Sequence, residues 1–288
     1  MENKDTDLDT KIKREAVKEQ VLSKDNSEHS KPAVNINMTD GVLIPKKSGE
    51  KHVLTSWRIT FTLTIAVSLF LIIFKPDPYR TIFLICLRGA PLTFEVTVLA
   101  IIGATLIGVF TGLGSVSKIR WINMLCGLYV ELIRGVPLLV QLIFLYYAAG
   151  RFFHVDGLVA AVIAMSVCFG AYMGEIVRGG IQAIPKGQME AATALGMSKT
   201  QAYIHVILPQ TIKVVLPAFG NEFISMLKDS SLVSNLALED ILRCGRMYIA
   251  RTFLSLETML VVALIYLFIT LVLSRLVGLL EERLHKNG

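Results

Sequence analysis

The chain has 288 residues, of which 53% are hydrophobic, and its mean hydropathy is +0.58. This composition excludes an ordinary soluble enzyme and indicates an integral membrane protein. The formal net charge is +6, but the basic residues form no clustered face of the kind that binds nucleic acid, so we expect no nucleic-acid partner.

Residues 1–52 are predicted to form a charged, disordered tail. The first 57 residues carry ten basic and ten acidic side chains and few aromatic ones. Such a segment buries too little apolar surface to fold alone, although KIKREAVKEQVL has a weak amphipathic pattern that suits a transient helix. No signal-peptide pattern precedes the first apolar run, which begins near Ile59. We therefore interpret that run as a retained membrane helix.

Six apolar segments follow, each long enough to cross a bilayer, because a span takes about 20 mostly apolar residues. They cover residues 57–74, 91–113, 121–149, 158–179, 211–232 and 256–280. The fifth segment is the least apolar of the six. The predicted fold class is therefore all-α, a polytopic transmembrane helical bundle.

The loop between the fourth and fifth spans is hydrophilic and carries signals for two short helices. Gly196 is a natural helix stop, because glycine readily takes the left-handed conformation found just after a helix end. Ser198 and Gln201 have the spacing of a capping box, which starts a second helix. Pro209 ends that helix or begins the next element. The pattern predicts a bent helical pair that a partner can grip; the alternative is a helical hairpin with no partner.

The loop pattern consists of EAA at 190–192, three residues, Gly196, nine residues and VILP at 206–209. It resembles the EAA loop of ABC importer permeases, in which a cytoplasmic helix docks into a groove on the ATPase subunit. The resemblance implies a coupling loop over 188–209 and both termini in the cytoplasm, whereas counts of Lys and Arg leave the orientation undecided. The implied coupling residues are Glu190, Ala191, Ala192, Gly196, Leu208 and Pro209.

Ionisable residues within a span are costly, and they usually face the bundle interior or a water-filled path. In the third span, Glu131 and Arg134 lie three residues apart and can pair on one helical face. Gly135 and Pro137 follow directly, and proline kinks a helix and frees a carbonyl at that depth. The alternative is that the charged pair anchors the helix at the inner headgroups.

The fourth span repeats this arrangement. Glu175 and Arg178 have the same spacing and are predicted to pair. Small residues in the same span form a stripe suited to close helix packing. These are Gly170, Ala171, Gly174, Gly179 and Gly180.

The fifth segment contains LKDSSLVSN, a polar cluster between apolar residues. It suggests a helix broken around a polar cavity; an amphipathic helix at the outer surface is the alternative. Together with the third and fourth spans, this cluster supplies candidate residues for a substrate path. They are Glu131, Arg134, Gln141, Glu175, Lys228, Asp229, Ser230 and Ser231.

Three longer strings extend the resemblance: ELIRGVPLLVQL, GAYMGEIVRGGIQAIPKGQMEAA and LPAFGNEFISMLKDSSLVS. They look like the permeases for polar amino acids such as glutamine, glutamate, histidine and arginine. Gly89 and Thr93 also match the opening motif of that branch. The similarity implies a permease domain over 85–284, preceded by an extra helix and an external connector over 53–84. The extra helix and the tail depart from the five-helix core usual in that branch.

The resemblance implies the membrane subunit of an ABC importer, with defined partners. These are a cytoplasmic ATPase dimer, a second permease subunit, an external amino-acid-binding protein, the amino acid and the lipid of a bacterial inner membrane. The chain has no P-loop of the form GxxxxGK followed by Ser or Thr, so we expect no ATP hydrolysis by this subunit; ATP and Mg²⁺ belong to the partner. The scattered cysteines and histidines indicate no metal or cofactor. The alternatives are an ABC permease for another small solute and an ATPase-independent transporter or channel.

Overall fold

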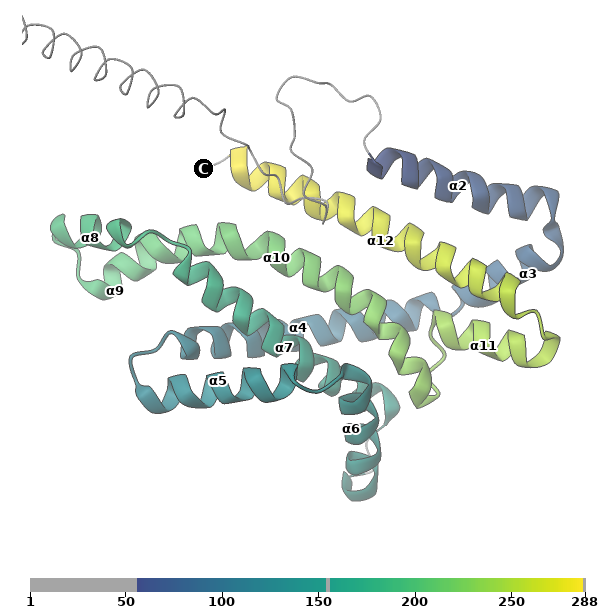
Figure 1. The fold of residues 1–288 in the computed structure, drawn as a ribbon, viewed down its shortest axis with the longest axis horizontal. Helices are drawn as coiled ribbons and strands as arrows, with labels where there is room; N and C mark the ends of the chain where they lie inside the picture. Colours follow the sequence, from purple (N-terminus) through teal and green to yellow (C-terminus); the bar gives the residue numbers. More distant parts are fainter. Residues whose placement is uncertain (1–55, 154–155, 287–288) are drawn as a thin grey trace, which may run out of the picture. The chain divides into compact units, whose positions relative to one another are not determined.

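The computed structural model describes residues 56–153 and 156–286, and Figure 1 shows their helices. The predicted tail over 1–52 lies outside the described residues. The helices in the first half are α2 (Ser56–Phe74), α3 (Pro76–Leu87), α4 (Ala90–Ser115), α5 (Arg120–Arg134), α6 (Leu138–Phe153) and α7 (Gly157–Gln182). The second half contains α8 (Lys186–Ala194), α9 (Lys199–Ala202), the π-helical η1 (Tyr203–Ile207), α10 (Leu208–Asp229), the 3-10 helix η2 (Ser230–Leu236), α11 (Ile241–Thr252) and α12 (Ser255–Lys286). The predicted all-α class is confirmed.

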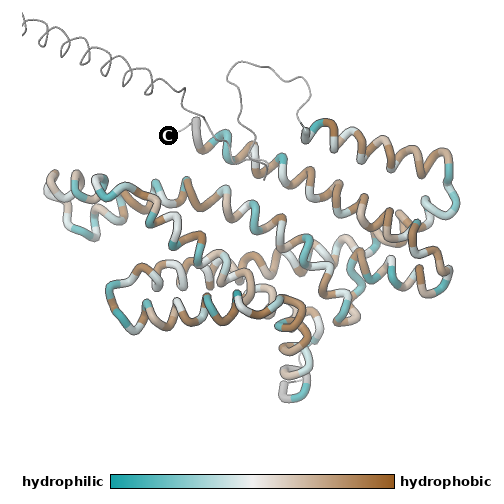
Figure 2. Tube along the Cα trace, viewed as in Figure 1, coloured by the Kyte–Doolittle hydropathy of each residue, from teal (hydrophilic) through white to brown (hydrophobic). Residues whose placement is uncertain are grey.

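Most predicted spans are present as long apolar helices. In the described part of the chain, five helical runs are long and apolar enough to cross a membrane, and the bent pair of α5 and α6 makes a sixth if it is counted as one span. Figure 2 shows hydrophobic residues along most of α2 and α12 and hydrophilic ones around α8 and α9. The residues before α4, which we expected to connect two spans, themselves form α3. This helix packs against α11 and α12.

The third span is broken at the predicted proline, more sharply than a kinked helix would be. α5 and α6 meet at an angle of 99°, with the break at residues 135–137. Proline lacks an N–H and cannot continue the ladder of helical hydrogen bonds, so the carbonyls before it lose their partners. The side-chain amide of Gln141 donates to the carbonyls of Ile133 and Val136, at 2.7 and 2.8 Å. The amide therefore satisfies the end of α5 that the break exposes.

The closest helix packing in the bundle joins α4 to α7. Small residues on both helices bring their backbones together, and a methyl group added to Gly112 would stand 2.5 Å from Cβ of Val177 and 2.7 Å from the carbonyl oxygen of Gly174. The predicted stripe on α7 is partly confirmed. Gly170 and Gly174 face α4, and Gly180 instead packs against Val215 of α10. Nothing lies within contact distance of a methyl group added to Gly179, so this residue takes no part in the packing.

The extra helix α2 packs against α12 in the opposite direction. The indole N–H of Trp57 donates to the carbonyl of Leu271 at 2.9 Å, and Phe61 stacks on Phe268 with ring centroids 5.8 Å apart. Because rising residue numbers in α2 meet falling numbers in α12, the helices are antiparallel. The start of α2 and the C-terminal half of α12 therefore lie on the same side of the bundle.

A buried polar joint connects α4, α11 and α12. The carboxylate of Asp240 accepts from the backbone N–H groups of Leu242 and Arg243, at 3.3 and 2.8 Å, and so caps α11. The hydroxyl of Tyr266 also donates to it, at 3.3 Å. The hydroxyl of Thr93 accepts from the N–H of Ile241 at 3.3 Å. The Gly89 and Thr93 pair noted in the sequence thus holds α4 against the start of α11.

Our first prediction tests the packing of α4 on α7. Gly112→Ala should lower the free energy of unfolding by about 1–3 kcal/mol, because an added methyl group forces tightly packed backbones apart. Gly127→Ala in α5 is the matched control, because its methyl group would have open space. Thermal unfolding of the purified variants in detergent measures both. Equal unfolding temperatures for the two variants would contradict the packing described here.

The second prediction concerns pH and the joint. Burial raises the pKa of Asp240 from 3.8 to about 6, although the backbone N–H groups of Arg243 and Leu242 oppose that shift. Because the pKa is higher in the folded state, protonation stabilises the fold, and this stabilisation is lost as the pH rises through 6. The unfolding temperature should therefore rise between pH 7.5 and pH 5, by an amount equivalent to about 1.4 kcal/mol, one pKa unit of linkage.

Asp240→Asn should abolish most of this dependence on pH, because the amide keeps the shape and does not ionise. Asp156→Asn serves as the control, because Asp156 is an exposed carboxylate that caps α7 in a similar way. An unchanged pH profile in Asp240→Asn would show that other groups govern the dependence.

Candidate functional site

The 188–209 loop has the bent geometry that its sequence predicts. Gly196 follows the end of α8 with φ of +85°, in the left-handed region. Its N–H donates to the carbonyl of Thr193, and the N–H of Met197 donates to that of Ala192, so the end of α8 is satisfied. Ser198 and Gln201 form the predicted capping box. The chain then runs through η1 directly into α10, and Pro209 stands in the first turn of α10.

The outer surface of this loop is unusually apolar for a solvent-exposed bend. Glu190 and Ala191 are exposed, whereas Ala192 is buried and holds α8 in place. Leu195 at the tip is 82% exposed. Leu208 and Pro209 are exposed at the far end of the loop. A displayed leucine beside small residues is typical of a surface that another protein covers.

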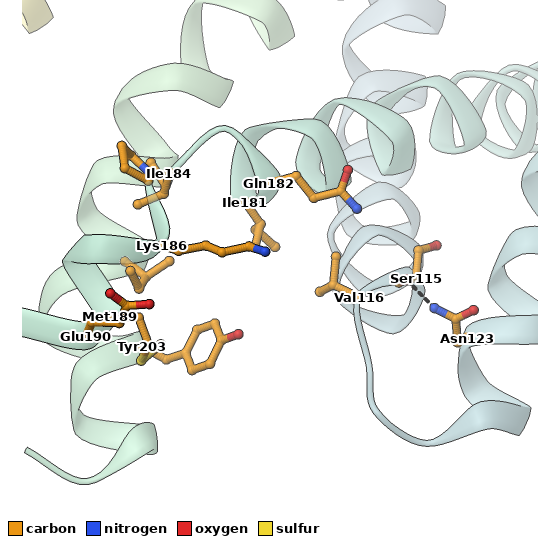
Figure 3. A pocket seen from close by; sticks show the side chains of 12 residues that line it. Ser115, Val116, Asn123, Ile181, Gln182, Ile184, Lys186, Met189, Glu190 and Tyr203 are labelled. Carbon is orange, nitrogen blue, oxygen red and sulfur yellow. Dashed lines mark hydrogen bonds between the residues drawn. The ribbon is translucent and has the colours of Figure 1, made fainter. Parts of the chain in front are cut away.

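A cavity of about 680 Å³ lies behind the loop (Figure 3). It is bounded by the end of α7, by α8, by η1 and by the turn from α4 to α5. In Figure 3 the side chain of Lys186 extends across it, and the amide of Asn123 donates to the carbonyl of Ser115 on the opposite wall. This space separates the loop from the α4–α5 turn.

A second cavity, of about 540 Å³, has a strongly charged wall. Glu131 and Arg134 line it from α5, and Glu175 and Arg178 line it from α7. Ser115, Asn123 and Gln182 line both cavities. The structure therefore brings together three residues that the sequence placed on a substrate path: Glu131, Arg134 and Glu175.

Only one of the two predicted ion pairs in this cavity forms. Glu175 pairs with Arg178, whose Nε donates to Oε2 of Glu175 at 3.0 Å. Among the described side chains, no ion pair joins Glu131 to Arg134. The guanidinium of Arg134 lies instead over the ring of Tyr172, 5.2 Å from its centroid. Tyr172 belongs to α7, so the side chain of Arg134 points from the end of α5 toward α7.

One carboxylate of α10, Glu222, lies within electrostatic reach of Arg134. The charge of Arg134 acts on both Glu175 and Glu222, and the charges of Lys228 and Asp229 also act on Glu222. Glu222 is half-buried. The sequence analysis noted no role for it, although a carboxylate inside an apolar segment is itself a signal of function.

Three other predicted path residues have different positions. Gln141 caps the end of α5, as described above. Ser230 is fully buried, its hydroxyl donates to the carbonyl of Leu227 at 2.7 Å, and it lies close to the phenol of Tyr266. Ser231 is half-buried in η2. The break between α10 and η2 is present as predicted, but Ser230 belongs to the buried joint around Tyr266 and not to an accessible surface.

The chain therefore combines apolar helices of membrane-spanning length, an open cavity with charges of both signs and an exposed, bent helical loop. This combination is typical of a membrane transport subunit. Residues 104–286 match the family described as binding-protein-dependent transport system inner membrane component. The match covers more than half of the chain.

Individual relatives agree with this match. The glutamine transport system permease protein GlnP of Escherichia coli (strain K12) is 38% identical over 202 residues, which cover 69% of this chain and 92% of that protein. The probable amino-acid permease protein YxeN of Bacillus subtilis (strain 168) is 36% identical over 204 residues, which cover 69% of this chain and 91% of that protein.

Solved structures agree as well. The crystal structure of an amino acid ABC transporter with histidines is 39% identical and has a TM-score of 0.67, covering 74% of this chain and 98% of that chain. The MetNI methionine ABC transporter, at 18% identity and a TM-score of 0.58, supports the fold alone. The chain belongs to the family of binding-protein-dependent transport system inner membrane components. It is an integral inner-membrane permease, a transport subunit and not an enzyme.

Proposed function

We propose that this permease imports a polar amino acid delivered by an external solute-binding protein. The observation that carries the proposal is the cavity in which Arg134 faces the carboxylates of Glu131 and Glu175. An amino acid carries a carboxylate and an ammonium group, so its path needs fixed charges of both signs. The names of the relatives, which refer to glutamine and to amino acids, support the same substrate class.

Each charged group in the proposed path has a role. Arg134 would bind the substrate carboxylate, because its guanidinium has no acidic partner within hydrogen-bonding distance among the described residues and offers paired donors. Glu175 is already paired with Arg178, so its capacity for an ammonium group is partly used. Glu131 on α5 and Glu222 on α10 are the other carboxylates near Arg134, and the charge of Asp229 acts on Glu222. We assign the ammonium group to these acidic side chains.

The proposed energy source is a pair of cytoplasmic ABC ATPases that hold the 188–209 loop. The exposed apolar tip around Leu195 and the exposed Glu190 and Ala191 suit a groove on such a partner. ATP-driven closure of the two ATPases would pull the loop inward and rock the spans against those of a second permease subunit. ATP and Mg²⁺ would be bound by the ATPases alone.

The proposed orientation places both termini in the cytoplasm. α2 begins beside the C-terminal half of α12, so the two ends of the described chain lie on one side. The end of α4, the end of α7 and α8 all bound one cavity, which places the loop on the side where α4 and α7 end. Counting α5 and α6 as one span gives six crossings, an even number, which agrees with both termini on the side of the loop.

The third prediction tests the coupling loop. Gly196→Val should abolish uptake while the protein still inserts, because a β-branched residue is strained at a positive φ and would distort the bend. Gly187→Val is the matched control, because Gly187 also has open space around it but lies inside α8. Uptake of labelled glutamine is measured at equal membrane abundance, and normal uptake by Gly196→Val would refute the role of the bend.

The fourth prediction tests the charged cavity. Arg134→Gln should lower substrate-stimulated ATP hydrolysis at least about tenfold, because a charge-assisted bond to the carboxylate is lost. Arg120→Gln, at the other end of α5, is the control and should retain activity.

Assembly with the ATPase is checked first for both variants. A complex of Arg134→Gln that assembles and turns over normally would place the substrate path elsewhere. A complex that falls apart would show that Arg134 holds the helices together.

A further inference from the structure

Three arginines surround the first turn of α11, on the face of the protein opposite the coupling loop. Arg88 follows α3, and Arg243 and Arg246 stand on α11. Arg88 and Arg246 are exposed, and Arg243 is half-buried. Among the described side chains, the ion pairs formed by arginine are with Glu175 and Glu282, and neither pair involves these three residues.

Two observations place Arg88 next to α11. A side chain at Gly89 would collide with the backbone of Asp240 and Ile241, so the end of α3 touches the start of α11. Burial raises the pKa of the Cys244 thiol, and the charge of Arg88 acts in the opposite direction. Glu239, which is exposed, and the buried Asp240 also act on this thiol, but three arginines outweigh these two carboxylates. The surface is therefore basic.

The arginines on α11 are short of acceptors. Nε of Arg243 is buried and has no hydrogen-bond partner, which is rare for a buried polar atom. Arg246 makes one long bond to the side chain of Asn235, at 3.4 Å. Guanidinium groups held in this way offer donors that fit carboxylates. The buried Nε itself is closed to another molecule, so an acidic side chain from outside would bind the exposed guanidinium of Arg246 and the half-buried side chain of Arg243.

A partner bound at α11 would act on the spans through the buried joint. Asp240 caps α11 and accepts from Tyr266 of α12, while the N–H of Ile241 donates to Thr93 of α4. These contacts make α11 a rigid extension of α4 and α12. A protein that binds the outer face of α11 would therefore act directly on both α4 and α12.

We propose that Arg88, Arg243 and Arg246 form a docking surface for acidic side chains of the external solute-binding protein. This inference rests on the proposed function, which requires such a partner. Anionic lipid headgroups also bind arginine, but the exposed apolar residues that would contact lipid lie at the other end of α11. There Phe253 and Leu256 are 86% and 81% exposed, with Arg251 next to them. The arginines proposed to bind protein and the residues suited to lipid therefore lie at opposite ends of α11.

The test measures binding to the assembled permease–ATPase complex in nanodiscs of zwitterionic lipid. The probe is the solute-binding protein that stimulates ATP hydrolysis by the wild-type complex. The double variant Arg243→Glu, Arg246→Glu should raise its Kd at least about tenfold at low salt, with a smaller difference in 0.5 M salt, because exposed charges are screened. Arg243→Lys, Arg246→Lys keeps the charges and should retain most of the affinity and its dependence on salt.

Arg251→Glu is the matched control on the same helix and should change the Kd less than about twofold. Arg88→Glu tests the surface from a different element and should weaken binding independently of α11. An unchanged Kd in both the Arg88 variant and the double variant would overturn the proposal.

Three further outcomes separate the alternatives. A defect that appears only in nanodiscs containing phosphatidylglycerol, and that Arg251→Glu shares, would assign the arginines to lipid and overturn the proposal. Loss of assembly or of basal ATP hydrolysis in both variants would assign them a structural role, with the same consequence. If no solute-binding protein stimulates the wild-type complex, the proposed function itself fails, and this inference fails with it.

Discussion

The close approach of α4 and α7 is the constraint on which the rest of the bundle depends. In lipid, helices gain little from apolar burial against one another, so their association relies on tight contact and on hydrogen bonds. Gly112 on α4 and Gly174 on α7 remove the side chains that would hold the backbones apart. α7 is then surrounded by α4, α5, α6 and α10. Its charged residues, Glu175 and Arg178, directly follow Gly174 and Val177, which contact α4, so that contact fixes the direction in which the charged side chains leave α7.

Around this rigid pair, the functional parts are placed at breaks in helices. α5 stops at Arg134, α10 tightens into η2 at Ser230, and the 188–209 loop bends at Gly196. Each break leaves backbone groups that must be satisfied, because unpaired polar groups are costly in a membrane. Gln141 satisfies one break and a helix-ending turn with a capping box satisfies another. When the backbone groups at a break have local hydrogen-bond partners, the span stays folded and a charged side chain at the break can point into a cavity.

The two ends of the bundle are built differently. On the side of the coupling loop, a large cavity separates α8 from the α4–α5 turn, so the loop has space around it. On the opposite side, the joint has a fully buried Asp240 and a partly buried Tyr266 and connects three helices. This contrast fits a subunit in which one face yields to an ATP-driven partner and the other transmits contact directly to the spans.

The sequence alone determined the helical class, the apolar spans, the presence of a proline kink in the third, the bend at Gly196 and the pairing of Glu175 with Arg178. These features depend on neighbours within a few residues: hydrophobic runs, capping positions and i, i+3 spacing. The tertiary structure alone decided the 99° break, the placement of Arg134 over Tyr172, the roles of Gln141 and Ser230, and the grouping of Arg88 with α11. Each of these depends on the direction in which a helix leaves a break or on contacts between distant elements, and no local pattern in the chain encodes that direction.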